Sequence, residues 1–417
     1  MGKSPLILAA LAKAAVPSLT FTSVKKLSAG GTGLFDSALL TSSTGEHYVA
    51  RTPQSKAGAL ELDVETQVLR TLGSSVRSKL PFKITSQLGE TKDSRGARVV
   101  LFEFLYGNPI DPARVAASSP LAGSIGSAIA AIHALDTESI RTAGLPEFSA
   151  AELVKKLVNE LDEVAATGEI PSALLSRWES ALEDVSLFRY QPTVVHGELS
   201  ADTVLELDGT VSAVLNWGAL HLGDPAQDLT WLASTVYGEL FDAVMLSYAK
   251  TSGSSDAGLK QRAALYNELA HARWLLLCIK KQDEQAIAEA RAEIGYLAQD
   301  LEDGILPALT ASAFVSAAAA GAFVTAEQAD AQASAESDEE VEQLNLDSLE
   351  ETVEEPSQPE ATSESATVTA PISQIELDHD YLVVDPRHRR SIRLVSTLWH
   401  VAIKSRWSFY RFLVTYL

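Results

Sequence analysis

Residues 194–232 carry polar side chains at a spacing that suits the transfer of a phosphoryl group. This chemistry needs a carboxylate to orient the attacking hydroxyl, and an amide and a second carboxylate to hold magnesium on the nucleotide phosphates. Glu198 closely follows His196, and Thr203 lies five residues after Glu198. Asn216 lies thirteen residues after Thr203. The spacing therefore predicts one acid and two neutral oxygen ligands around a single centre.

Three short strings in this segment resemble the signature of the aminoglycoside and macrolide phosphotransferase family. The chain reads VHGELSADTVL, VLNW and GDPAQDLT, where the family usually reads VHGDLHPGNVL, VIDW and GDPxxDLA. The resemblance places Glu198 at the family's catalytic Asp. It places Thr203 at the metal-binding Asn and Asn216 at the metal-binding Asp.

The resemblance implies a fold as well as a reaction. We expect an α+β, two-lobed protein-kinase-like fold, with a small antiparallel-sheet N-lobe and a mainly helical C-lobe. The implied cofactors are ATP or GTP together with Mg²⁺, and the implied partner is a small-molecule hydroxyl acceptor. His196, Asp224 and Asp228 are expected to brace the catalytic loop by hydrogen bonds, whether or not chemistry survives.

Each substitution has its own physical consequence. Glu198 keeps the charge of Asp but is one methylene longer, and a displacement of about 1 Å in a catalytic group can cost on the order of 100-fold in rate. Thr203 offers one hydroxyl oxygen, and Asn216 removes a negative charge that Mg²⁺ would normally meet. Asp202 is either a replacement ligand or a turn residue that bonds to the local backbone.

Two functional interpretations follow from these residues. In the first, the protein is a catalytically impaired phosphotransferase-fold protein that serves as a binding or regulatory module. In the second, it is a working small-molecule O-phosphotransferase, with Glu198 as base and Thr203, Asn216 and Asp202 as a weak magnesium site. We favour the first because lost charge at the metal site removes electrostatic stabilisation, which usually dominates this chemistry.

The N-lobe is expected at residues 1–106. Its first apolar run predicts a helix packed on this lobe, because Lys13 interrupts the run and argues against an export signal. Alternating segments predict strands at residues 21–24, 37–40 and 47–51. Gly30, Gly31 and Gly33 follow the first strand and form either a flap over the phosphates or a plain surface turn.

Two more features belong to the nucleotide side. Arg51 ends the third strand, where the family carries a basic residue for the nucleotide phosphates, and Glu65, in a helix expected over residues 60–72, would be its partner. The alternative is an ordinary surface ion pair. A buried strand at residues 97–107 is expected to run into a hinge, and the backbone between Glu103 and Leu105 is expected to meet an adenine edge.

The helical C-lobe is expected at residues 107–310. Apolar periodicity predicts helices at residues 121–135, 151–167, 173–185, 228–250 and 262–300. His133 is expected to be structural, and Glu268 is one of the acids that could face a cationic acceptor. The single cysteine, Cys278, is expected to be a packed thiol. One cysteine cannot form an internal disulfide, which is typical of a cytoplasmic protein.

After residue 310 the composition changes. Residues 321–385 contain eighteen Asp or Glu and no Lys or Arg, which is most of the net charge of −22. Low hydrophobicity with many like charges predicts a disordered acidic linker over residues 311–385. An apolar island from Val341 to Val353 lies within it and is either a partner-binding helix or part of a solvated spacer.

The last segment, residues 386–417, reverses the sign, with seven Lys or Arg and no acid. Helical spacing places Trp and Phe side chains opposite the charges, which predicts a C-terminal basic amphipathic helix. One interpretation is peripheral association with an anionic surface of the inner membrane; the others are docking on the C-lobe or a protein partner, or no function. The acidic balance of the chain argues against nucleic acid.

Overall fold

The computed structural model describes residues 2–27, 34–253 and 256–310. All of these residues lie within one compact unit of the chain. The expected glycine flap at Gly30, Gly31 and Gly33 lies outside the described residues. The expected acidic linker and basic amphipathic helix lie outside them as well.

The N-lobe is built on a five-stranded antiparallel sheet with the order β1-β2-β3-β6-β5. The strands are β1 (Phe21–Lys26), β2 (Phe35–Ser42), β3 (His47–Pro53), β5 (Gln87–Lys92) and β6 (Arg98–Glu103). Along β3 the side chains alternate between buried and half-buried, as expected for a strand that separates two layers. The strands that the alternation predicted are confirmed.

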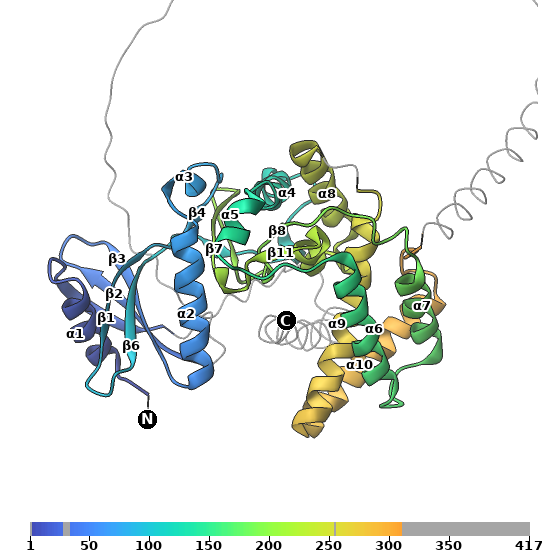
Figure 1. Ribbon diagram of the computed structural model, residues 1–417, viewed down its shortest axis with the longest axis horizontal. Coiled ribbons are helices and arrows are strands. Elements are labelled where there is room, and N and C mark those ends of the chain that lie inside the picture. The colour runs from blue at the N-terminus through green and yellow to red at the C-terminus, as the bar shows by residue number, and fades with distance from the viewer. Residues whose placement is uncertain (1, 28–33, 254–255, 311–417) are drawn as a thin grey trace, which may run out of the picture. The chain divides into compact units, whose positions relative to one another are not determined.

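Two helices cover opposite faces of this sheet, α1 (Pro5–Ala15) and α2 (Lys56–Thr71) (Figure 1). The predicted N-terminal helix is confirmed as α1, which buries Leu8 and Ala12 against the sheet. The second helix begins four residues before the expected Leu60, because the Ser55 side chain caps it by accepting the Gly58 N–H. A short helix, α3 (Ser74–Arg77), follows.

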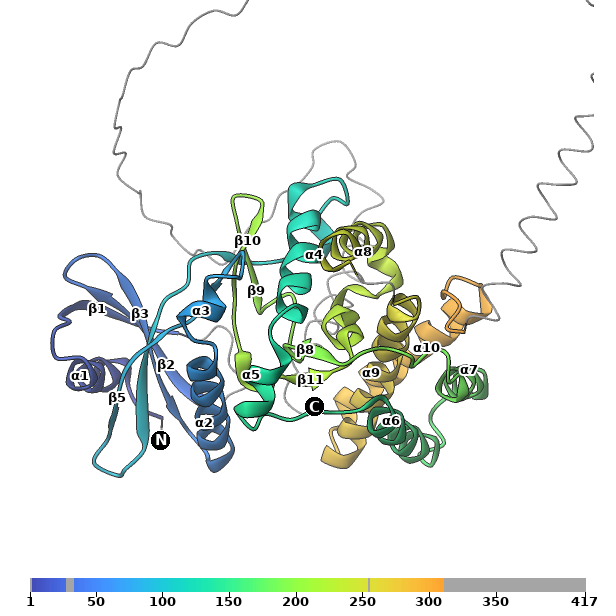
Figure 2. The same cartoon turned by 45° about the horizontal axis from the view of Figure 1, so that its top comes forward.

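The C-lobe is mainly helical (Figure 2). Its α-helices are α4 (Pro120–His133), α5 (Thr137–Thr142), α6 (Ala150–Ala165), α7 (Ser172–Glu183), α8 (Gly238–Ser252), α9 (Leu259–Lys281) and α10 (Glu284–Glu302). The helices α4 and α8 approach closely at Gly126, where an added Cβ would lie 2.3 Å from the Val244 carbonyl oxygen. One apolar core runs from α2 through this lobe and includes the fully buried Trp178 and Trp217.

Two of the expected helices are each broken in two. Residues Pro225–Leu232 form a 3₁₀ helix, η3, and α8 begins only at Gly238, so the helix expected over residues 228–250 is wrong in its first part. The helix expected over residues 262–300 is interrupted at Gln282, whose φ of 58° is left-handed. Asp283 then caps α10. Both breaks are set by local backbone geometry that apolar periodicity does not record.

Two small sheets hold the segment with the candidate chemistry. One has the strand order β4-β10-β9-β7, with β4 (Lys83–Ile84), β7 (Asn108–Pro109), β9 (Val204–Leu207) and β10 (Thr210–Val214). The other pairs β8 (Thr193–Val195) with β11 (His221–Gly223). The hairpin of β9 and β10 turns at Asp208 and Gly209, which both have positive φ, as a type I′ turn requires.

Three short 3₁₀ helices complete the fold: η1 (Pro112–Arg114), η2 (Trp217–Ala219) and η4 (Thr235–Tyr237).

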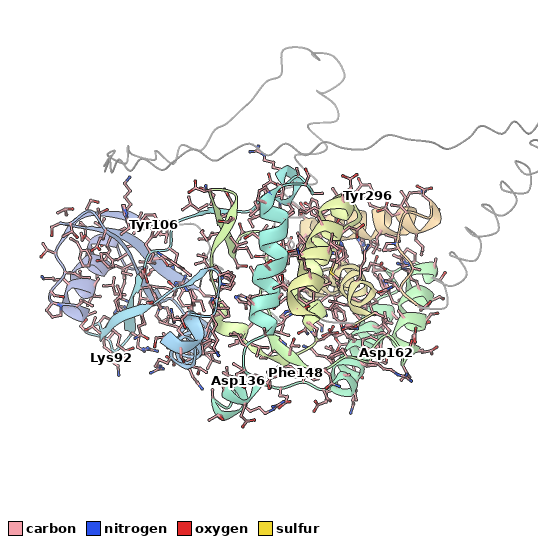
Figure 3. The ribbon with its side chains drawn as sticks, turned by 90° about the horizontal axis from the view of Figure 1, so that it is seen from above. Lys92, Tyr106, Asp136, Phe148, Asp162 and Tyr296 are labelled. Carbon is pink, nitrogen blue, oxygen red and sulfur yellow. The ribbon has the colours of Figure 1, made fainter. Side chains whose placement is uncertain are left out.

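Figure 3 shows Tyr106, where the N-lobe gives way to the C-lobe, with Asp162 and Tyr296 on the helices of the C-lobe. Among the described helices, none is both long and apolar enough to cross a membrane.

Candidate functional site

Asp228, on η3, fixes the loop that carries the candidate catalytic acid. Its buried carboxylate accepts the backbone N–H groups of His196 and Gly197, each at 2.8 Å. His133 donates to the same carboxylate at 3.2 Å. Burial acts to raise the pKa of Asp228, but the hydrogen bonds from His133 and the His196 backbone outweigh burial and lower it. The expected structural role of His133 and the bracing role of Asp228 are therefore confirmed.

His196 is a positioning residue in this geometry. Its Nε2 donates to the Leu215 carbonyl oxygen at 2.9 Å, and its Nδ1 accepts the Glu198 N–H at 3.2 Å. The ring packs edge-on against Trp217, with centroids 4.7 Å apart. Burial lowers the pKa of His196 to about 4, so the imidazole is neutral at pH 7. With both ring nitrogens in use, His196 ties the loop to the segment before Asn216.

Gly197 allows the loop to turn at this point. Its φ is +83°, a conformation that side chains disfavour. A Cβ at this position would also lie 2.7 Å from the Ala219 carbonyl oxygen. The tight turn brings Glu198 out of the loop beside α2.

The carboxyl group of Glu198 lies among other acids. Burial raises its pKa to about 8, and the nearby carboxylates of Glu61 and Glu65 on α2 add to the shift. The pKa of Glu61 is raised as well, by burial and by Glu65. Sequence reasoning missed Glu61; it lies one helical turn before Glu65, which is the signal that could have identified it.

Thr203 closes the catalytic loop on itself. Its Oγ1 accepts the Ser200 N–H at 2.8 Å and lies 3.1 Å from the Glu198 carbonyl oxygen and 3.2 Å from that of Ser200. The side chain is buried. Thr203 therefore uses its hydroxyl to hold Glu198 and Ser200 in place. Its assignment as a metal ligand stays a prediction, and these contacts favour the structural role.

Asn216 follows the hairpin in a left-handed conformation, with φ 61° and ψ 60°. Asn tolerates this region better than most residues, because its short polar side chain can bond locally. The residue directly before it, Leu215, is the one that His196 holds, so the backbone places Asn216 beside the catalytic loop. Asp202 lies half-buried on that loop. The roles of both residues toward a metal stay predictions.

Magnesium prefers hard, mostly anionic oxygen ligands in octahedral geometry. The centre offers a neutral amide at Asn216, a hydroxyl already bonded at Thr203, a carboxyl at Glu198 whose raised pKa favours its neutral form, and the half-buried carboxylate of Asp202. Within residues 2–27, 34–253 and 256–310, no group of three or more His, Cys, Asp or Glu side chains is arranged to hold a metal ion. Compared with the magnesium site that the family resemblance implies, this donor set lacks a carboxylate at position 216, and its hydroxyl at position 203 is already bonded within the loop.

The nucleotide side contains the expected pair. Arg51, on β3, donates through Nη1 to Glu65 Oε2 on α2 at 3.0 Å, and the two side chains are 21% and 8% exposed. The guanidinium also lies over two aromatic rings, 5.1 Å from the Phe35 centroid and 5.8 Å from that of Phe102. The pairing of Arg51 with Glu65 is confirmed, and the role of Arg51 toward nucleotide phosphates stays a prediction.

The expected hinge follows β6. Glu103 donates its N–H to the Ser86 carbonyl oxygen at 2.9 Å, and its own carbonyl accepts the Thr85 hydroxyl at 3.0 Å. Leu105 packs into a small apolar cluster with Leu205 and Ala213. Sequence reasoning missed this cluster, because its three residues come from separate segments of the chain. The adenine contact of Glu103 and Leu105 stays a prediction.

Asp224 serves a different part of the fold from Asp228. Arg262, on α9, is fully buried and donates to Asp224 at 2.6 and 2.9 Å and to Asp256 at 2.6 and 3.1 Å. Tyr266 adds a third donor to Asp224, at 2.6 Å. The expectation that Asp224 braces the catalytic loop directly needs correction, because its carboxylate anchors η3 to α9. Asp256 is too far from Asp224 in sequence for spacing to reveal the network.

Glu268 and Cys278, both on α9, are structural in this arrangement. Arg177 donates to both carboxylate oxygens of Glu268, at 2.8 and 2.9 Å, and Trp178 Nε1 donates at 2.8 Å. Glu268 is therefore buried and paired within the C-lobe, and its contact with a cationic acceptor stays a prediction. The Cys278 thiol is buried, and burial raises its pKa, as expected for a packed thiol.

Comparisons with known proteins agree with this geometry. The chain matches the phosphotransferase enzyme family over residues 30–266. It is 24% identical to viomycin phosphotransferase of Streptomyces vinaceus over 257 residues, which cover 59% of this chain and 86% of that protein.

Solved structures with a similar fold come from the same class of enzymes. Macrolide 2'-phosphotransferase MphH from Brachybacterium faecium gives a TM-score of 0.57 at 25% identity, covering 69% of this chain and 97% of that one. The GDP complex of wild-type aminoglycoside 2'-phosphotransferase-IIIa gives a TM-score of 0.57 at 20% identity, covering 70% and 98%.

Proposed function

We propose, from the premise that this chain belongs to the phosphotransferase enzyme family, that it is a catalytically impaired member acting as a binding or regulatory module. The observation that carries this proposal is the engagement of the Thr203 hydroxyl inside the catalytic loop. At the position where the family resemblance expects a metal-binding amide, the oxygen is already bonded. Asn216 is neutral as well, so a magnesium ion would be held weakly. The phosphates of a nucleotide would then meet little compensating positive charge.

The state of Glu198 supports the same proposal. A group with a pKa of about 8 is mainly protonated at pH 7, and a protonated carboxyl cannot accept the proton of an attacking hydroxyl. The three acids Glu61, Glu65 and Glu198 would also repel the negative γ-phosphate as they ionise. The reaction would therefore be slow even with a nucleotide in place.

Binding of a phosphate-bearing ligand is a separate matter from catalysis. The Arg51–Glu65 pair is preorganised, and a guanidinium offers several donors to phosphate oxygens. The brace from Asp228 keeps the catalytic loop in shape. We infer that a nucleotide such as ATP or GTP binds at the N-lobe side of the site without being turned over at an ordinary rate.

The alternative is an active ATP- or GTP-dependent O-phosphotransferase that acts on a small-molecule hydroxyl. One observation favours it: the acid at position 198 is retained on a loop that is fully braced. In that case the relatives suggest an antibiotic-like acceptor, since viomycin phosphotransferase is among them. The two functions differ in whether the centre binds magnesium productively.

A thermal-shift series with ATP or GTP, each with and without Mg²⁺, tests the proposal. A ligand that binds only the folded protein raises the melting temperature of that protein. Adding ATP or GTP should therefore raise the melting temperature of the wild-type chain, and this rise should be the same with and without Mg²⁺. The double variant Thr203→Asn with Asn216→Asp restores the ligands of the family pattern. It should gain a Mg²⁺-dependent shift.

A matched control introduces the same residue types far from the centre, Thr210→Asn with Asn159→Asp, both at exposed positions. This control should respond to Mg²⁺ like the wild type. A Mg²⁺-dependent shift in the wild type that disappears in Asn216→Ala would reject the proposal. Phosphate transfer to a hydroxyl would then be assayed with viomycin and a macrolide as acceptors.

A further inference from the structure

A chain of buried polar side chains leads from helix α8 to the catalytic loop. The hydroxyl oxygen of Tyr248, on α8, lies 2.9 Å from Nδ1 of His133, the last residue of α4. Nε2 of the same imidazole lies 3.2 Å from the carboxylate of Asp228. That carboxylate accepts the backbone N–H groups of His196 and Gly197. The chain therefore ends on the backbone directly before the candidate acid.

We call Tyr248, His133 and Asp228 the α8 relay. All three side chains are buried. In a buried setting a hydrogen bond is electrostatically strong, and a polar atom that loses its partner is costly. The rings of Tyr248 and His133 also pack edge to face, with centroids 5.4 Å apart and planes at 74°. Hydrogen bonding and ring packing therefore fix the same contact.

The hydrogen bonds of the α8 relay have a direction. Burial acts to raise the pKa of Asp228, but the hydrogen bond from His133 helps to lower it, so the carboxylate is ionised and can only accept. The proton is thus on Nε2 of His133. In a neutral imidazole the other nitrogen accepts, so the Tyr248 hydroxyl donates to Nδ1. Burial raises the pKa of Tyr248 above its ordinary value, which keeps this proton on the hydroxyl.

The position of Tyr248 is set by close packing of α8 on α4, which lie side by side in Figure 2. A Cβ at Gly126, on α4, would lie 2.8 Å from the backbone nitrogen of Tyr248. One residue earlier on α8, Ser247 donates its hydroxyl to the Gly123 carbonyl oxygen at 2.7 Å. The two helices therefore present the tyrosine and the imidazole from one tightly packed unit.

We infer that Tyr248 is a positioning residue for the catalytic loop and that it acts through His133. Its hydroxyl holds the imidazole in the orientation that donates to Asp228, and Asp228 holds the loop backbone. Without the hydroxyl, Nδ1 of His133 would stay buried with no donor, and the ring would lose the contact that orients it. The inference rests on the proposed function in one respect, because this loop is part of the proposed nucleotide site.

The competing explanation is that Tyr248 is only a core residue, since its ring packs in the apolar core of the C-lobe. Loss of the hydroxyl would then lower the stability of the whole fold, and all slowly exchanging amides would be affected alike. A residue that acts through the α8 relay would instead loosen the loop more than the rest of the chain. Local opening and global unfolding can be told apart by hydrogen exchange.

Hydrogen exchange of the full chain, read by mass spectrometry, tests the inference. Tyr248→Phe removes only the hydroxyl and should speed exchange of the His196 and Gly197 amides about ten-fold. The amides of β6 should change less. Tyr296→Phe is the matched control, because Tyr296 is 60% exposed on α10, and it should leave the loop amides unchanged. Equal acceleration in the loop and in β6 after Tyr248→Phe would overturn the inference.

A double-mutant cycle shows whether the hydroxyl acts through the imidazole. His133→Phe removes the middle of the α8 relay, so adding Tyr248→Phe should not speed loop exchange further. Additive effects of the two substitutions would overturn the inference.

The ¹⁵N NMR spectrum of the histidine-labelled wild-type chain gives a test that needs no folded variant. At neutral pH it should show the His133 proton on Nε2 and none on Nδ1. A proton on Nδ1 would overturn the inference, because the Tyr248 hydroxyl could not then donate to it.

None of these measurements includes a nucleotide. A thermal-shift series without any nucleotide effect would therefore count against the proposed function and leave the α8 relay standing. Uniform exchange after Tyr248→Phe would count against the relay and leave the proposed function standing.

Discussion

The Oγ1 atom of Thr203 lies 3.1 Å from the backbone carbonyl oxygen of Glu198. The same atom accepts the Ser200 N–H, so one side chain fixes the shape of the loop that presents the candidate acid. A residue in this position can hold the loop without holding a metal. The loop can therefore keep its form whether or not a metal binds beside it.

Replacing Thr203 with Val should lower the free energy of unfolding by about 1–2 kcal/mol, because the buried N–H of Ser200 would lose its acceptor. Urea denaturation measures this change. The control is Thr210→Val, at an exposed position in the hairpin, which should stay within about 0.5 kcal/mol of the wild type. Equal effects of the two variants would show that the Thr203 hydroxyl does not hold the loop.

The pH dependence of stability should report on Glu198. Its pKa is about 8 in the folded chain and 4.5 ordinarily, so the folded state holds the proton more tightly than the unfolded state. The resulting stabilisation is complete below pH 4.5 and is lost as the pH rises to 8. Relative to the wild type, Glu198→Gln should therefore gain about 2–4 kcal/mol between pH 5 and pH 8.5.

Urea denaturation at several pH values measures this gain for Glu198→Gln. Glu138→Gln, at an exposed carboxylate on α5, serves as the control and should follow the wild type across the range. Parallel curves for Glu198→Gln and the wild type would mean that Glu198 titrates in the folded chain as it does in the unfolded chain.

Asp228→Asn should destabilise the protein by about 3–5 kcal/mol. The buried carboxylate accepts two backbone N–H groups and His133, and an amide in its place would turn a donor toward at least one of them. Asp242→Asn, which affects an exposed pair with Lys260, should cost less than about 1 kcal/mol. Chemical denaturation of both variants decides the comparison, and a small loss for Asp228→Asn would remove Asp228 as the anchor of the loop.

A double-mutant cycle should give the Arg51–Glu65 pair a coupling energy of about 1–2 kcal/mol, because both side chains are mostly buried. The variants are Arg51→Met and Glu65→Gln, alone and together. The exposed pair of Arg291 and Glu169 should give about 0.5 kcal/mol or less in the same cycle. Equal coupling energies in the two cycles would show that the Arg51–Glu65 pair contributes no more than an exposed ion pair.

Local signals in the sequence predicted much of this fold. The turn at Asp208 and Gly209 and the strands of the N-lobe follow from alternation and turn chemistry within a few residues. The Arg51–Glu65 pair could be predicted because the resembled family places a basic residue at this strand end and its acidic partner on the following helix. The order of the candidate residues along the catalytic loop came from the same source.

What the sequence could not provide depends on contacts between distant segments. Arg262 reaches Asp224 across 38 positions, and no spacing rule connects them. The proximity of Glu61 to Glu198 depends on how α2 packs beside the loop. The engagement of Thr203 required the backbone of the loop itself, because residue type alone allows a hydroxyl to bind either a metal or an amide.

The buried contacts between Arg262 and Asp224 join η3 to α9 without involving Glu198, Thr203 or Asn216. The residues that anchor η3 to α9 are thus a different set from those that would perform the reaction. Mutations in the second set leave this buried anchor in place, and the loss of about 1–2 kcal/mol expected at Thr203 is smaller than the stability of a typical domain, so an ancestral enzyme can drift to a new task one substitution at a time while each intermediate still folds. The same separation would allow an engineer to reinstall a reactive centre in this scaffold without redesigning its support.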